Sequence, residues 1–146
     1  MAFVLSKEAI KEIMKNADDA FELIQEIAGL APEMIISDLK IGLAFRYGFL
    51  IAAQAILTLS NYIVIKENLG IPKNFLESLM MLKSNKILSK EDGEIAGFIV
   101  DTRNLILHES AEISTKDIKS ISEKIEKIKE MYDRIRQKVE QYLTGQ

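Results

Sequence analysis

Apolar residues recur at helical spacing along nearly the whole chain. In the last segment they step alternately by three and four residues, which is a heptad seam along one side of a long helix. The seam comprises Ile118, Ile121, Ile125, Ile128, Tyr132, Ile135, Val139 and Tyr142. Ser114 and Asp117 form a capping-box pattern that predicts a start near residue 115, and Gly145 fits the end. We interpret the seam as core rather than as an interface with a partner.

Four further helices follow from the same periodicity and from short polar caps. They run from a Ser6 cap to Gly29, over about 33–68, over about 75–84 after Asn74, and over about 90–108 after Ser89 and Asp92. The Gly70-Ile71-Pro72 sequence separates the second from the third. No run alternates as a strand does. The pattern predicts an all-α fold, an up-and-down four-helix bundle with an extra short helix.

One apolar stretch has the length of a membrane span. Nineteen uncharged residues separate Arg46 from Lys66. The stretch is interrupted by Gln54, Thr58, Ser60 and Asn61. We therefore favour a helix buried in the middle of the bundle over a membrane helix. The first residues have neither the basic region nor the long apolar stretch of a signal peptide, so we expect a cytoplasmic protein without membrane contact.

Composition favours a globular chain with one hydrophobic core. The 146 residues are 48% hydrophobic and 28% charged, so we expect a single helical domain over residues 1–146. The chain has no cysteine and one histidine, which excludes disulfides, thiolate catalysis and the common zinc sites. No carboxylates at metal-ligand spacing accompany the histidine, so we expect no metal or other cofactor. The net charge of −3 offers no overall positive field to nucleic acid.

The predicted helix over 90–108 carries an arginine in an unusual place. On a helical wheel Arg103 lies within an apolar face. That face comprises Ile95, Ala96, Ile99, Val100, Ile106 and Leu107. A guanidinium there must pair with a carboxylate or helix carbonyls, extend to water, or face a polar cavity.

Asp101, Asn104 and His108 share a stripe on the opposite side of this helix. A histidine at a helix end often only satisfies the last carbonyls. Residue chemistry therefore leaves structural and functional roles open for both Arg103 and His108.

The order Arg103-Asn104-Leu105-Ile106-Leu107-His108 resembles the signature of the HEPN superfamily, an arginine, usually followed by a polar residue, and a histidine four to six residues further on. Within it the chain is most similar to HepT, a ribonuclease toxin encoded beside a minimal nucleotidyltransferase antitoxin. The resemblance spans about residues 40–143. Its other supporting segments are Ala44-Phe45-Arg46-Tyr47, Ile51-Ala52-Ala53-Gln54-Ala55, Asn61, Gly70-Ile71-Pro72, Phe75 and Leu79.

This resemblance implies a homodimer in which Arg103 and His108 of both subunits form one composite site in a cleft. The implied reaction is metal-independent RNA cleavage, in which the imidazole moves the proton of a ribose 2′-hydroxyl and the guanidinium binds the phosphate. Asn104 would orient the imidazole or contact the phosphate, and DNA would resist. On an ideal helix Arg103 and His108 lie about 140° apart, so a shared site needs distortion at the helix end or pairing across a two-fold axis.

One residue departs from this family pattern, and the local charge points the same way. HepT proteins typically carry a tyrosine two residues after the histidine, thought to be modified with AMP by the partner, and here that position is Ser110. Either the serine accepts the nucleotide, another residue does, or this regulation is absent. Residues 91–112 hold six acidic residues and one arginine, a net charge of −5, although phosphate binding usually relies on basic residues. Nearby basic residues, which could hold RNA or form a solvated face, are Lys73, Lys83, Lys86 and Lys90.

Three functions remain open at this point. The leading hypothesis is a HEPN ribonuclease toxin that is silenced by a nucleotidyltransferase-fold antitoxin. The alternative is a non-catalytic subunit that binds a nucleotide or presents substrate to a minimal nucleotidyltransferase. The third is a dimerising helical scaffold, in which Arg103 and His108 only form salt bridges. RNA cleavage, nucleotide-dependent stabilisation and a pure loss of stability in alanine variants distinguish the three.

Overall fold

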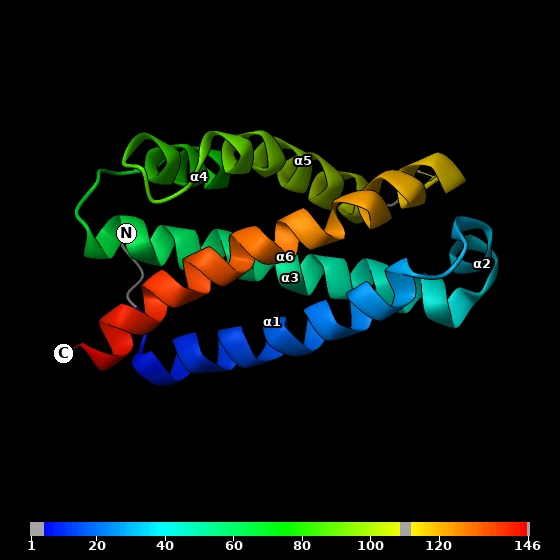
Figure 1. Ribbon diagram of the computed structural model, residues 1–146, viewed down its shortest axis with the longest axis horizontal. Helices are drawn as coiled ribbons and strands as arrows, with labels where there is room; N and C mark the ends of the chain where they lie inside the picture. The colour runs from blue at the N-terminus through cyan, green and yellow to red at the C-terminus, as the bar shows by residue number, and fades with distance from the viewer. Residues whose placement is uncertain (1–4, 109–111, 146) are drawn as a thin grey trace.

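The structure, a computed structural model, describes residues 5–108 and 112–145 and contains six α-helices in those ranges (Figure 1). Their bounds are α1 (Lys7–Ala28), α2 (Pro32–Ser37), α3 (Leu39–Lys66), α4 (Phe75–Ser84), α5 (Lys90–Leu107) and α6 (Thr115–Thr144). The long helices α1, α3, α5 and α6 alternate in direction, and the start of α1 and the end of α6 lie at the same end of the bundle. The predicted all-α class is confirmed.

Short polar side chains begin the helices where the sequence predicted them. Asn74 accepts a hydrogen bond from the first turn of α4 at 2.8 Å. Ser89 with Asp92, and Ser114 with Asp117, form the two predicted capping boxes, in which each side chain accepts a bond from the other residue's backbone N–H. These caps satisfy backbone donors that have no partner inside the helix, so they fix where α4, α5 and α6 start.

The long apolar helix α3 lies in the middle of the bundle and contacts every other helix. By length and composition it could cross a membrane, but 67% of its most apolar window is buried inside the bundle. Figure 1 shows α6 crossing on one side of α3, with α1 along one edge and α4 and α5 along the other. This arrangement agrees with the interpretation of the stretch as a central helix.

The predicted single helix over 33–68 is wrong at one point, because the chain breaks at Asp38. Asp38 has an extended backbone (φ −92°, ψ 112°), and its side chain accepts a hydrogen bond from the N–H of Ile41 at 3.0 Å. The helix therefore restarts as α3, and α2 folds against it. A Cβ on Gly42 would lie 2.7 Å from the carbonyl oxygen of Ile35, so this close packing requires glycine.

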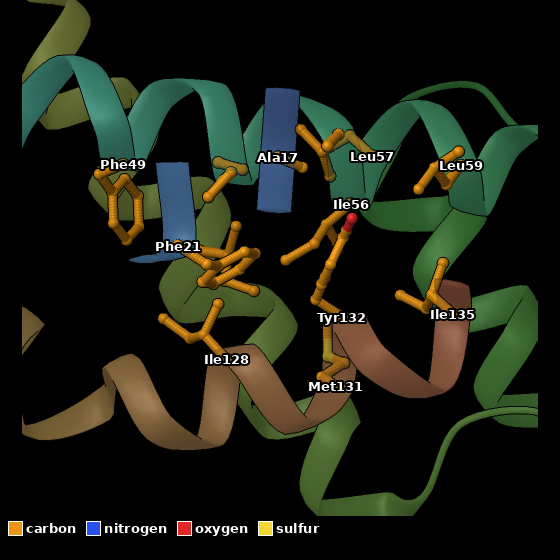
Figure 2. Packing of buried hydrophobic residues seen from close by; sticks show 14 of the residues in the cluster. Ala17, Phe21, Phe49, Ile56, Leu57, Leu59, Ile128, Met131, Tyr132 and Ile135 are labelled. Atoms are coloured by element: carbon orange, nitrogen blue, oxygen red, sulfur yellow. The ribbon is translucent and has the colours of Figure 1, made fainter. Parts of the chain in front are cut away.

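The heptad seam of α6 forms the core, as predicted. Its residues from Ile118 to Val139 are buried, and Tyr142 is half-buried. Figure 2 shows Tyr132 reaching between the side chains of α1 and α3. Its ring lies 4.8 Å from that of Phe21, centroid to centroid, and its hydroxyl lies 3.1 Å from the carbonyl oxygen of Met14. This core holds α3 and α6 in a fixed relation, and α5 packs along both.

Candidate functional site

The start of α5 is anchored by an ion pair to α6. Asp92 is only 2% exposed, and both of its oxygens bond to the guanidinium of Arg134, one of them to Nε at 3.1 Å. A two-point contact of this kind restricts rotation of the helix about its axis. The carboxylate that caps α5 thereby also orients the helix that carries the candidate site.

Near its other end, α5 places Arg103 at the edge of its buried face. The side chain is half-buried and lines a groove of about 400 Å³ between α1, α3 and α5. Neighbours in the groove are Ile13 and Asn16 of α1, Tyr47, Gln54 and Thr58 of α3, and Leu107 of α5. Among the described residues, no hydrogen bond or ion pair holds the Arg103 guanidinium. Arg103 therefore faces a cavity, and its guanidinium is available to an anionic ligand.

His108 ends α5 rather than continuing it. Its backbone is extended (φ −81°, ψ 104°), and its N–H donates to the carbonyl oxygens of Asn104 at 3.1 Å and Leu105 at 3.3 Å. Only the residues after His108 leave the helix, because its φ and its bond to Asn104 are still helical, so its side chain stays about 140° around the axis from Arg103. A site shared by Arg103 and His108 therefore still needs a second copy of the motif or a change of side-chain direction. His108, Asn104 and Asp101 are all exposed at this end of the bundle.

The other predicted site residues lie elsewhere. Ser110 lies outside the described residues. Lys83, Lys86 and Lys90 are exposed around the turn between α4 and α5, and Lys90 precedes Arg103 by thirteen residues, about 20 Å along the helix. Within one chain the structure therefore does not bring these lysines to Arg103.

The pairing of the arginines separates two kinds of surface. Arg134 and Arg136 of α6 are paired with Asp92 and Asp18. Arg46 of α3 resembles Arg103: it has no hydrogen-bond or ion-pair partner in the described ranges, and its Nε is buried. Of these two unpaired arginines, Arg103 alone lines the groove.

The pairing on α6 has an electrostatic effect on Asp18. Burial opposes ionisation of this carboxyl, but hydrogen bonds from Arg136 and Tyr132 outweigh it and hold the pKa of Asp18 below its usual value. Asp18 therefore stays ionised as a fixed partner of α6, which is a structural role.

Sequence reasoning missed the part of the site that α3 contributes. Gln54, Thr58 and Asn61 were interpreted as interruptions of an apolar stretch, and Gln54 and Asn61 also as part of the family resemblance, but none was predicted to line the site, although they recur at i, i+4 and i+7. That spacing places them on one side of α3, and the structure shows that this side is open to solvent next to Arg103. No group of three or more His, Asp or Glu side chains that could hold a metal ion occurs among the described residues.

Comparison with known proteins gives a family and a fold. A family model described as Ribonuclease HepT-like matches residues 17–138. A tri-AMPylated HEPN toxin from Shewanella oneidensis, solved in complex with the MNT antitoxin, is 18% identical with a TM-score of 0.76, covering 87% of this chain and 96% of that chain. A toxin–antitoxin complex with AMP-PNP gives the same 18%, 0.76, 87% and 96%. No curated protein matches the chain.

Proposed function

Because the chain belongs to the HepT-like family of ribonucleases, we propose that it is the toxin of a toxin–antitoxin pair, a cytoplasmic endoribonuclease that works without a metal. The observation that carries this proposal is the position of Arg103. Its guanidinium is half-buried in a groove without a partner among the described side chains, five residues before the histidine that ends the same helix. The Arg103 charge faces the solvent-open groove without a partner in the described part of the chain, and an RNA phosphate in the groove would supply one.

The chemistry assigned to these residues is transesterification within RNA. The His108 imidazole takes the proton of a ribose 2′-hydroxyl, whose oxygen attacks the adjacent phosphorus while the 5′-oxygen leaves and gains a proton. The Arg103 guanidinium binds the phosphoryl oxygens as negative charge builds on them. Asn104, one turn before His108, contacts the phosphate or orients the imidazole. The products carry a 2′,3′-cyclic phosphate and a 5′-hydroxyl.

A homodimer would complete this site with a second Arg103 and His108. Support comes from large apolar side chains that are exposed at the same end of the bundle: Leu39 (74%), Leu43 (54%), Tyr47 (67%) and Leu107 (51%). Tyr47 and Leu107 line the Arg103 groove itself. Leu39 and Leu43 do not line the groove, and a two-fold contact through such exposed apolar side chains would bring two copies of the motif together while leaving the groove open beside them.

The partner that silences the toxin would be a nucleotidyltransferase-fold antitoxin. The similar solved structures are toxin–antitoxin complexes, one of which is tri-AMPylated. Ser110 stands at the position where the family pattern has tyrosine, and we retain it as a candidate modification position. Lys83, Lys86 and Lys90 lie around the turn before α5, too far from Arg103 of the same chain to bind the scissile phosphate, so their predicted RNA contact concerns flanking nucleotides.

RNA cleavage by the purified protein in EDTA tests the proposal directly. Wild type should cut RNA and leave a DNA of the same sequence intact, because DNA lacks the 2′-hydroxyl. The RNA ends should carry a 2′,3′-cyclic phosphate, and His108→Ala should abolish cleavage while circular dichroism shows a retained fold. A well-folded protein that cuts no RNA would contradict the ribonuclease assignment.

The acidic surface favours a second candidate function. Asp101 is exposed beside Asn104 and His108, within residues 91–112 of net charge −5. A negative surface disfavours a long RNA but tolerates one nucleotide whose phosphate is bound by Arg103. The chain would then be a non-catalytic subunit that holds a nucleotide or substrate for a nucleotidyltransferase. Nucleotides that raise the melting temperature in the absence of RNA turnover would support this alternative.

A further inference from the structure

Two cavities lie along α3, neither of them lined by a described residue of α6, and they meet at Thr58. The first is the groove of about 400 Å³ that contains Arg103. The second, of about 600 Å³, is lined by residues near the end of α3 and the start of α4, among them Asn61, Lys66 and Phe75. We call the two together the α3 groove. It follows α3 from Tyr47 to Lys66, nineteen residues or about 28 Å of helix.

The charge of the α3 groove is opposite to that of the protein. The chain as a whole carries −3, yet neither cavity has an aspartate or glutamate among its described lining residues. The two charged side chains that line it are Arg103 at one end and Lys66 at the other. Neither forms an ion pair with a described residue; the Lys66 ammonium lies 5.5 Å from the ring centre of Tyr62. An extended anion would bridge the two cations.

The remaining lining suits nucleobases. Tyr47 and Phe75 are exposed by 67% and 39% and present aromatic rings in the two cavities. Between them lie Gln54 and Thr58, joined by a hydrogen bond of 3.2 Å, and Asn61. Aromatic rings stack on unpaired bases, and amides and hydroxyls bond to base edges. A paired duplex hides those faces and edges.

We propose that the α3 groove binds single-stranded RNA and leads it from Phe75 and Lys66 to the phosphate-binding Arg103. The proposal rests on the proposed ribonuclease function, to which it adds the path along which the strand reaches Arg103. Bases stack on the exposed rings, and Lys66 and Arg103 neutralise phosphates at the two ends. Double-stranded RNA enters poorly, because its bases are stacked on one another and paired.

Binding of a fluorescently labelled single-stranded RNA with 2′-O-methyl riboses tests the groove, because such a strand cannot be cleaved. Phe75→Ala should weaken binding by about fivefold or more, since it removes a stacking ring. The neighbouring Leu76→Ala, at a residue that does not line the groove, is the matched control and should stay within about twofold of wild type. Anisotropy titrations give the dissociation constants, and circular dichroism checks the fold.

Charge reversal gives an independent second pair of variants. Lys66→Glu should weaken binding by about threefold or more, because it places a negative charge along the RNA backbone. Lys127→Glu changes the same residue type at an exposed position of α6 and should bind like wild type. A duplex of the same sequence should compete at least about tenfold less well than the single strand.

The outcomes separate this proposal from the ribonuclease assignment. If Phe75→Ala and Lys66→Glu bind the strand as well as their controls do, or if duplex competes equally, the groove is not the RNA path, whether or not RNA is cut. If wild type is a dimer that binds no strand, a second copy covers the groove and the proposal fails. If the strand binds through the groove but natural RNA is never cleaved, the groove stands and the ribonuclease assignment falls.

Discussion

Polar groups on the two sides of the central helix α3 differ in whether they have partners within the chain. Between α1 and α6, the Tyr132 hydroxyl lies 2.8 Å from Asp18, and Arg136 pairs with the same carboxylate. Burial raises the pKa of Tyr132, and the bond to Asp18 raises it further, so the phenol stays neutral and serves as a fixed donor. Each of these groups has a partner within the chain, which is what stability requires.

On the α3–α5 side, charge and apolar surface lack such partners. Arg103 has none among the described residues, and Tyr47 and Leu107 expose most or half of their surface. These groups face solvent in the isolated chain, so an anion or another protein surface can bind them without breaking contacts within the described part of the chain. We infer that the α1–α6 side stabilises the fold and that the α3–α5 side is available for binding.

The largest expected effect is on activity, in Arg103→Ala. Loss of one preorganised donor to a developing negative charge typically lowers kcat about 10²–10³-fold. Because the arginine has no partner among the described groups, the free energy of unfolding should change by less than about 0.5 kcal/mol. RNA cleavage rates and urea denaturation measure the two quantities.

Arg136→Ala on α6 is the matched arginine for that experiment. It removes the pairing with Asp18 and Glu140, so it should lower stability and leave RNA cleavage within about twofold of wild type. Loss of stability in Arg103→Ala together with loss of activity in Arg136→Ala would mean that the α3–α5 side is the structural one and the α1–α6 side the functional one.

Tyr132→Phe should give the next largest effect, on stability alone. The substitution keeps the ring against Phe21 but leaves the Met14 carbonyl and Asp18 without the phenolic hydrogen bond. A buried hydrogen bond lost in this way costs about 1–2 kcal/mol of unfolding free energy. Urea midpoints measure it, and an unchanged midpoint would mean that the network does not support the fold.

The helix limits could be predicted because their causes are local in sequence. The capping boxes of α5 (Ser89 and Asp92) and α6 (Ser114 and Asp117) each lie within four residues, so both helices start where the sequence predicted. The break at Asp38 was missed because it depends on α2 folding back onto Gly42, a contact between two helices.

The candidate site likewise has a part that is local in sequence and a part that depends on packing between helices. Arg103 and His108 are visible as a motif in one segment, but the cavity that Arg103 faces is built from three helices. In the sequence Gln54 and Thr58 interrupt an apolar stretch of α3. Their place in the groove follows only from the packing of α1 and α5 beside them. The position of a side chain in a groove depends on packing between distant segments, and the periodicity of the sequence does not predict that packing.

Two glycines differ in how closely the backbone packs against its neighbours. A Cβ on Gly48 of α3 would lie 2.6 Å from Cγ2 of the buried Ile24 of α1, whereas a Cβ on Gly97 of α5 would meet nothing within 4 Å. Gly48→Ala should therefore lower the unfolding free energy by about 1 kcal/mol or more through overpacking. Gly97→Ala should raise it by up to about 1 kcal/mol, because alanine favours the helix.

Urea denaturation of both glycine variants at equal protein concentration gives the comparison. Stabilisation by Gly48→Ala would show that α1 can move away from α3. A destabilised Gly97→Ala would show that the outer side of α5 is covered in solution.

The smallest expected effect is the pH dependence that Asp18 contributes. Its pKa is lowered in the folded protein, so the stability it provides is present above the unfolded pKa of about 4 and is lost as the pH falls through the lower folded value. Asp18→Asn keeps the shape but removes the charge. Wild type should therefore exceed the variant in urea midpoint at pH 6, and the difference should shrink at pH 3. The margin should be small, because the carboxylate is 41% exposed and water screens its pairing with Arg136. A difference that is equal at both pH values would show that the charge on Asp18 does not stabilise the α1–α6 side, and that its hydrogen bonds alone do.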